Sequence, residues 1–134
     1  MSGFSQDYEI TMLEAAVGKS PEAERWVALT TTAPTKSAAG TAATYTGYAR
    51  VKTTHTAWKD AVGGEPSEID NESTLTFAEC TGSTSTVKYF EIWTSLSGTS
   101  ATERVGWGEL SVEKTISSGD TASFAAGELK LTQK

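Results

Sequence analysis

Apolar residues recur at two different spacings along the chain, and the change falls near residue 26. In the N-terminal segment the apolar positions lie three and four residues apart, on one face of a helix; they are Ile10, Leu13 and Val17. Ser5 stands before this run as a candidate N-cap, and Gly18 follows it where a helix commonly ends in a left-handed residue. The pattern predicts one short helix over residues 6–17.

From Trp26 onward the apolar spacing becomes two, which is typical of strands with one buried face. Two long loops, 33–47 and 59–72, interrupt the alternation, and shorter Gly-containing and Ser-containing turns separate the remaining segments. The predicted strands span 26–32, 48–58, 73–80, 87–96 and 104–116 (one bent strand or two), and residues 121–133 are predicted to form a final pair of short strands.

Many short strands with frequent turns indicate an all-β protein, either an antiparallel β-sandwich or a jelly-roll-like barrel, with one short N-terminal helix. We expect a single β domain over residues 1–134, with an N-terminal arm and helix at 1–18 and a β-sandwich at 26–134. Within residues 26–134 the run 87–96 is the most apolar and is predicted to be central. The glycines flanking Trp107 suggest a bulge or a close backbone approach.

The C-terminal stretch, residues 106–134, is the most regularly patterned part of the chain. Its alternation places one set of apolar side chains on a common buried face: Val112, Ile116, Phe124, Leu129 and Leu131. The charged residues of the same stretch are expected in solvent: Glu113, Lys114 and Lys130. The pattern is that of a scaffold, with few residue types that perform chemistry.

The charge and composition of the chain argue against two classes of partner, nucleic acids and anionic membranes. The 134-residue chain has a formal net charge of −6 and no basic run, so binding to nucleic acid or to an anionic membrane is not expected. No apolar run approaches the roughly 20 residues of a transmembrane helix, and the N-terminus lacks the pattern of a signal peptide. We expect synthesis in a cytoplasm and, with one cysteine, no intrachain disulfide.

Residues with reactive side chains are few, and none has a catalytic context. His55 is expected on a strand surface, and Cys80 is expected to be a buried or half-buried structural thiol. The acidic residues of the second loop could in principle hold Ca²⁺ but lack the order of a known calcium loop; they are Glu65, Glu68, Asp70 and Glu72. A hydrolase using Cys80 with Asp70 and Glu72 is the alternative, but we expect no enzyme and no catalytic, cofactor or metal site.

Aromatic residues are the best candidates for partner contacts. Tryptophans in a small β domain are commonly core or interface residues, although exposed rings can also stack on sugars; the four are Trp26, Trp58, Trp93 and Trp107. The predicted partner contacts are Phe4, Tyr8, Trp58 and Trp107. Segment 1–18 is a candidate anchoring arm, or else caps the sandwich, and loop 33–47 and the predicted turn 106–108 are candidate contact loops.

The order of several short motifs resembles a family of small tailed-bacteriophage virion proteins, described as decoration-like or tail-fibre-like β-domain proteins. After the N-terminal helix these motifs are WVALTTTAPT, YTGYARV, YFEIWTSLSG and GWGELSVEKTISSGDTASFAAGELKLT. The similarity covers most of the chain and lies in the order and spacing of the motifs.

The resemblance implies a virion surface component, with no catalytic residue to carry over. We expect a capsid decoration (cement) protein, with a tail component as the alternative. A decoration protein would bind the outside of the major capsid lattice as a homotrimer and clamp neighbouring capsomers. A tail, tail-fibre or adaptor component would contact other tail proteins or host-surface glycans. Repeated copies on a symmetric particle multiply modest contacts.

Overall fold

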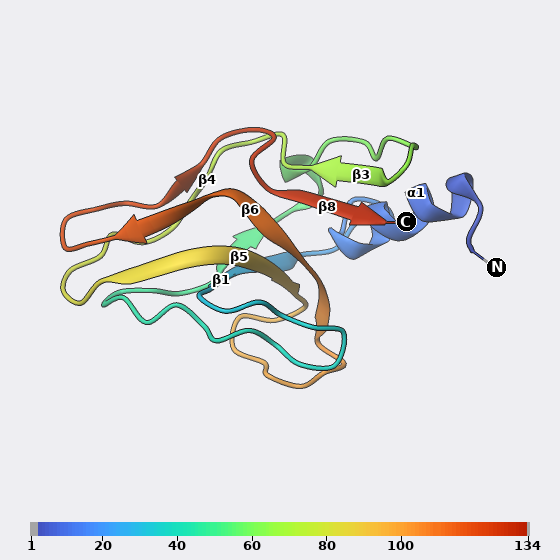
Figure 1. Ribbon diagram of the computed structural model, residues 1–134. Coiled ribbons are helices and arrows are strands. Elements are labelled where there is room, and N and C mark those ends of the chain that lie inside the picture. The colour runs from blue at the N-terminus through green and yellow to red at the C-terminus, as the bar shows by residue number, and fades with distance from the viewer. Residues whose placement is uncertain (1–2, 134) are drawn as a thin grey trace.

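The structure is a computed structural model that describes residues 3–133. One helix precedes a series of strands in chain order (Figure 1). The elements are α1 (Gln6–Ala16), β1 (Arg25–Thr30), β2 (Val51–Thr53), the 3-10 turn η1 (His55–Ala57), β3 (Ser67–Asp70), β4 (Leu75–Thr76), β5 (Ser85–Trp93), β6 (Arg104–Ile116), β7 (Ser123–Phe124) and β8 (Lys130–Gln133).

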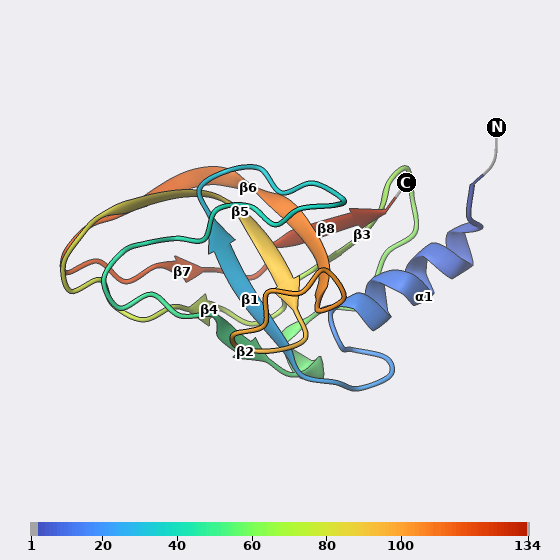
Figure 2. The same cartoon turned by 90° about the horizontal axis from the view of Figure 1, so that it is seen from below.

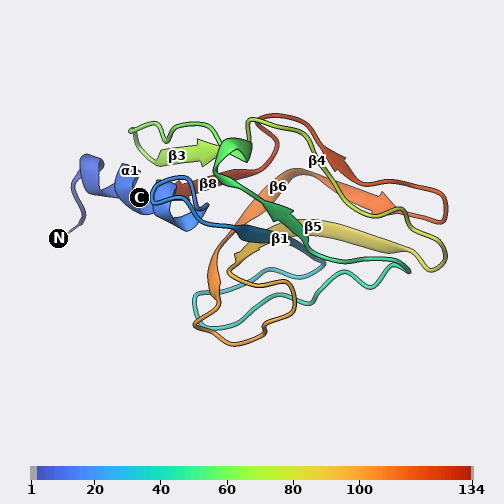
Figure 3. The ribbon, with the colours of Figure 1, turned by 180° about the vertical axis from the view of Figure 1, so that it is seen from behind.

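The strands form one larger sheet and two short ladders, all antiparallel. The larger sheet has the order β2-β1-β5-β6, and the ladders pair β3 with β8 and β4 with β7. Figures 1 and 3 show the two ladders above the four-stranded sheet, with β6 curving up between the layers. The predicted all-β fold with one short helix is confirmed.

Helix α1 forms where the sequence predicts it, for the expected local reasons. The Ser5 hydroxyl accepts a hydrogen bond from the Tyr8 amide at 3.3 Å, which caps the first turn. Gly18 takes a φ of +77° just past the helix, the left-handed conformation that glycine adopts without strain. Arg25 of β1 then donates to the Ala15 and Ala16 carbonyls and satisfies the helix C-terminus.

The core lies between the larger sheet and the two ladders. Aromatic side chains fill its centre, with Phe77 edge-on to Phe124 at a centroid distance of 5.7 Å. The largest fully buried side chains come from both layers and from α1's C-terminal end: Trp58, Phe77, Phe90, Phe124, Leu29, Ile69, Ile92, Ile116, Leu129, Val17, Val27 and Val87. Most of the apolar face predicted for the C-terminal stretch is thus confirmed, and so is the central position of β5, between β1 and β6.

Three predicted segments differ from the structure. The strand predicted over 48–58 is limited to β2, because residues 55–57 form a 3-10 turn that swings the next side chain into the core. The loop predicted over 59–72 contains β3, whose single buried aliphatic residue gave no visible alternation. The strand predicted over 73–80 shrinks to β4, although Leu75 and Phe77 do share a buried face.

Val112 is a correction within the C-terminal stretch, because it is 70% exposed instead of buried. The pairing of β5 with β6 shifts register between Val87 and Tyr89, and Val112 falls in the stretch of β6 between the two registers. An irregularity of this kind displaces the two-residue alternation, so one parity does not stay inside over the whole strand.

Candidate partner-contact surface

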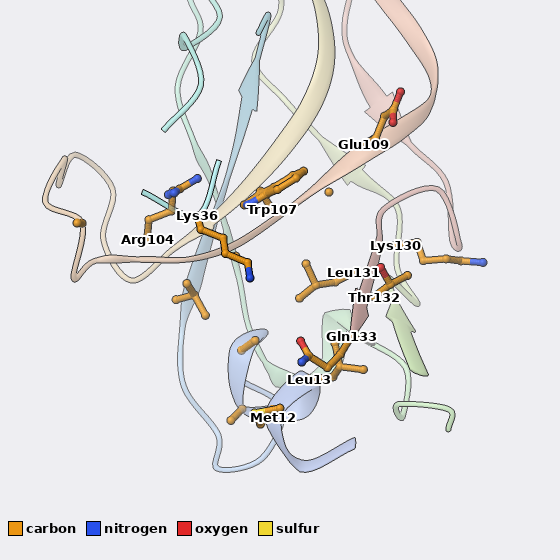
Figure 4. Close-up of a pocket in the computed structure, with 16 residues that line it drawn as sticks. Met12, Leu13, Lys36, Arg104, Trp107, Glu109, Lys130, Leu131, Thr132 and Gln133 are labelled. Carbon is orange, nitrogen blue, oxygen red and sulfur yellow. The ribbon is translucent and has the colours of Figure 1, made fainter. Parts of the chain in front are cut away.

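A groove of about 1000 Å³ runs between α1, β6 and β8 (Figure 4). We call it the β6–β8 groove. Its walls are mostly apolar, with Leu13 on α1, Val105 and Trp107 on β6, and Leu131 on β8. β6 is one of the two edge strands of the larger sheet, and it faces β8 without pairing to it in a ladder. The groove therefore occupies a seam between the layers that no described side chain fills.

Glycines on either side of Trp107 shape the β6 wall. A Cβ at Gly108 would lie 2.6 Å from a Phe90 ring carbon and 2.8 Å from the Lys130 carbonyl oxygen, so the backbone passes too close to its neighbours for a side chain. The predicted close approach is confirmed at Gly108. The pairing of β5 with β6 also shifts register between Ile92 and Trp93, beside this point. Residues 106–108 lie inside β6, so the predicted turn at this position is wrong.

Trp107 is among the residues that line the groove, and 37% of its surface is exposed. Its side chain lies on the outer face of the larger sheet, whereas the neighbouring Gly106 faces Leu131. Trp107 pairs across the ladder with Glu91 of β5. Charged and polar residues border the same groove at Lys36, Glu109 and Lys130. Lys130 also forms an ion pair with Glu68, with the Nζ and Oε1 atoms 3.4 Å apart. The groove thus joins an apolar wall to a charged rim, the anatomy of a contact surface.

The N-terminal aromatic residues are also accessible. Phe4 is 59% exposed and Tyr8 is 53% exposed, and their ring centroids lie 5.8 Å apart. They lie on the end of α1 that extends beyond the strands (Figure 2). Whether Phe4, Tyr8 and Trp107 contact a partner stays a prediction, but all three are presented to solvent.

Trp58 corrects the list of predicted contacts. Its side chain is fully buried, and its indole nitrogen donates to the Thr53 hydroxyl at 3.2 Å. A ring enclosed by the core presents no surface to a partner. The core interpretation of tryptophan therefore holds for Trp58 and for buried Trp93, whereas Trp26 is half-buried.

A buried charged cluster lies on the outer face of the larger sheet and was not predicted from the sequence. Glu91 is 2% exposed, and its carboxylate accepts hydrogen bonds from the Gly40 amide at 2.9 Å and the Trp93 indole at 3.1 Å. The Arg104 guanidinium lies 3.5 Å from the same carboxylate and donates to the Thr35 carbonyl. These contacts hold the predicted contact loop, residues 33–47, against the sheet.

A second arginine extends this cluster. The Arg50 guanidinium stacks over the Trp93 ring at 4.1 Å and donates to the Ser95 and Gly98 carbonyls. Burial lowers the pKa of Arg50 from its ordinary value, although neighbouring Glu91 and other acids oppose the shift. Strand alternation places Glu91 on the face opposite Phe90 and Ile92. In the sequence, the one signal of this buried cluster is a glutamate within the most apolar run of the chain.

The remaining candidates for chemistry are scattered. His55 lies in the 3-10 turn η1, not on a strand, with its Nδ1 3.2 Å from a Glu22 carboxylate oxygen. Cys80 is buried, as predicted, with its thiol directed at the Ser83 carbonyl. In the acidic segment, Glu68 and Asp70 lie on β3 and pair with lysines. Within residues 3–133 no three His, Cys, Asp or Glu side chains gather as a metal site.

Across the part of the chain that the structure describes, no helix is long and apolar enough to span a membrane. Comparison with curated proteins finds no match. The model of one protein family, described as "Podophage GP4 fiber I protein gp80", matches residues 4–132. That match includes α1, the whole larger sheet and both ladders except the last residue of β8. The chain therefore belongs to this bacteriophage fibre protein family, in agreement with the resemblance to small tailed-phage virion proteins.

Proposed function

We propose that the chain is a non-enzymatic structural component of a bacteriophage fibre, which works by contacts to other copies of itself and to tail proteins. The observation that carries this proposal is the family match over residues 4–132, whose description is that of a fibre protein. It favours the tail-fibre hypothesis over capsid decoration, which has no comparable support.

The distribution of side chains agrees with a structural role. Cys80 is buried and Asp70 pairs with Lys59 at 3.5 Å, so two of the three residues of the hydrolase alternative are separately engaged, while Glu72 is exposed. The accessible features are surfaces: the β6–β8 groove, the N-terminal aromatic residues and loop 33–47. The proposal also includes a contact of the fibre with host glycans, because the Trp107 side chain is 37% exposed and has polar groups beside it.

Gold labelling of intact virions with an antibody against this chain, viewed by electron microscopy, tests the proposal. Label at the tail is the expected result. Label spread over the head would overturn the fibre location in favour of capsid decoration on the major capsid protein. Absence of label from all particles, with antibody that binds the purified chain, would remove the virion role itself. Antibody absorbed with purified chain serves as the control.

A further inference from the structure

The outer face of the larger sheet carries one open aromatic ring bordered by polar groups. Trp107 pairs with Glu91, and strand alternation turns both side chains to this face. Glu109 and its partner Tyr89 lie two positions along on the same face. We call Trp107, Tyr89, Glu109 and the neighbouring Lys36 the outer-face site. We propose that the outer-face site binds an uncharged sugar ring of a glycan. This inference rests on the glycan contact in the proposed function, and it names the residues and the ligand class.

Trp107 supplies the surface on which a sugar ring can stack. The side chains of Trp58 and Trp93 donate their indole N–H groups to partners inside the protein. The Trp107 indole is 37% exposed and forms no such bond within residues 3–133. A sugar ring has apolar C–H groups on one side and hydroxyl groups around its edge. Trp107 therefore offers both contacts that such a ring needs, an apolar face and a free N–H donor.

Two charged side chains of opposite sign border the Trp107 ring. Glu109 is two residues away on the same strand face, which is about 7 Å along a strand. Lys36 lines the same opening as Trp107 (Figure 4). Both are exposed, and neither forms an ion pair with another described residue. Because their charges offset each other, the site selects neither an anion nor a cation. Hydroxyl groups donate and accept, so they suit both Glu109 and Lys36.

The loops next to the outer-face site are rich in hydroxyl groups and poor in charge. Lys36 is the only charged residue of loop 33–47, and Glu103 is the only one in residues 94–103. Ala101, in the second of these loops, lines the same opening as Trp107. A polyanionic glycan would need a cluster of cations here, and the net charge of −6 would repel it. The surroundings therefore favour an uncharged sugar.

Buried arginines hold both loops in place before any ligand arrives. Arg104 donates to the Thr35 carbonyl, next to Lys36 in the chain. Arg50 donates to two carbonyls of residues 94–103. A weakly bound ligand gains from an ordered site, because no loop has to be immobilised when it binds. The charged cluster thus prepares the outer-face site without touching the sugar.

Nuclear magnetic resonance of the full chain with simple sugars tests this inference. The probes are the methyl glycosides of glucose, galactose, mannose, N-acetylglucosamine and rhamnose, with methyl glucuronide as the acidic counterpart of methyl glucoside. The indole N–H signal of Trp107, identified by its loss in Trp107→Phe, reports where a sugar binds. Saturation-transfer difference spectra measure affinity. The variants are Trp107→Ala and Glu109→Ala, and the matched control is Glu113→Ala, an exposed glutamate of β6 outside the opening.

We expect at least one uncharged glycoside to shift the Trp107 signal, with a dissociation constant of about 10 mM. Trp107→Ala should weaken binding about tenfold or more and Glu109→Ala about threefold, whereas Glu113→Ala should leave it unchanged. Circular dichroism verifies folding. If Trp107→Ala does not fold, Glu109→Ala against Glu113→Ala makes the same comparison.

Three results would overturn the inference. They are the absence of any shift at about 100 mM of every probe, equal binding by folded Trp107→Ala or by Glu109→Ala, and tighter binding of methyl glucuronide than of methyl glucoside. Virion labelling reads the fibre location without any sugar, so the location and the sugar site fail separately.

Discussion

The side chain of Asn71 gives the sharpest test of how the two ladders are joined. Asn71 is fully buried between β3 and β4. Its Oδ1 accepts hydrogen bonds from the Gly127 and Leu129 amides at 3.1 and 3.0 Å. Its Nδ2 donates to carbonyls on both connections: Ser73 at 2.9 Å, Phe124 at 3.3 Å and Ala125 at 3.0 Å. One amide thus links the β3–β4 connection to the β7–β8 connection.

Replacement of Asn71 by Ala should be strongly destabilising. The buried Leu129 amide loses its side-chain acceptor, and an unsatisfied buried group costs about 1–3 kcal/mol. Loss of the other bonds adds about 0.5–1.5 kcal/mol each where no alternative partner exists. With partial relaxation we expect a total of about 3–5 kcal/mol, a large share of the roughly 5–15 kcal/mol that stabilises a domain.

Urea unfolding followed by tryptophan fluorescence measures this loss. With a slope of about 2 kcal/mol/M, Asn71→Ala should lower the midpoint by about 2 M at unchanged slope. The exposed neighbour provides the control, since Glu72→Ala should change stability by less than about 0.5 kcal/mol. A midpoint for Asn71→Ala within about 0.3 M of the parent, on the same scale, would refute the role assigned to the amide.

The Asn71→Asp variant adds a pH signature to the same test. An aspartate here would be buried and would face three carbonyl oxygens, so its folded-state pKa would be raised above the unfolded value of about 3.9. An acid with a raised pKa loses stability as pH rises from the unfolded pKa through the folded one. The deficit relative to the parent should therefore grow from pH 4 to pH 8; a constant deficit would contradict the burial argument.

Three further predictions follow from packing and ionisation. Gly108→Ala should cost about 1–3 kcal/mol by overpacking against Phe90, whereas Gly106→Ala, whose Cβ meets Leu131 only at ordinary contact distance, should be mild in urea unfolding. Burial raises the pKa of Tyr48, so stability should fall as pH rises above about 10, and absorbance at 295 nm should show a late-titrating phenol that Tyr48→Phe removes. The Cys80 thiol should react with Ellman's reagent only in denaturant; fast reaction of the native chain would contradict its burial.

The sequence predicted the fold well where local signals and side-chain alternation agree. The helix has a cap at Ser5 and a glycine at its end, and the long strands β5 and β6 carry several apolar residues each. It failed at β3, where one buried Ile69 cannot reveal a period of two. It also failed at Val112, because a register shift is set by the partner strand and is not written in β6 alone.

The candidate surface was only partly predictable for a related reason. Exposure of Phe4, Tyr8 and Trp107 agrees with their choice as contacts, whereas buried Trp58 shows that residue type alone does not separate core from surface. The groove joins residues of α1, β6 and β8. Leu13 on α1 and Arg104 on β6 are more than ninety positions apart in the sequence. Such a seam depends on how the two layers meet and has no signature within any one segment.

The buried ion pair of Glu91 and Arg104 fixes the position of loop 33–47 against the larger sheet. A buried pair is weak evidence for stability, because desolvation offsets much of the attraction, but it can fix a single arrangement. Here Glu91 holds loop 33–47 through Gly40, and Arg104 holds it through Thr35. The next residue along the loop, Lys36, lines the β6–β8 groove together with Arg104. The charged cluster on the outer face of the larger sheet therefore positions the rim of the groove.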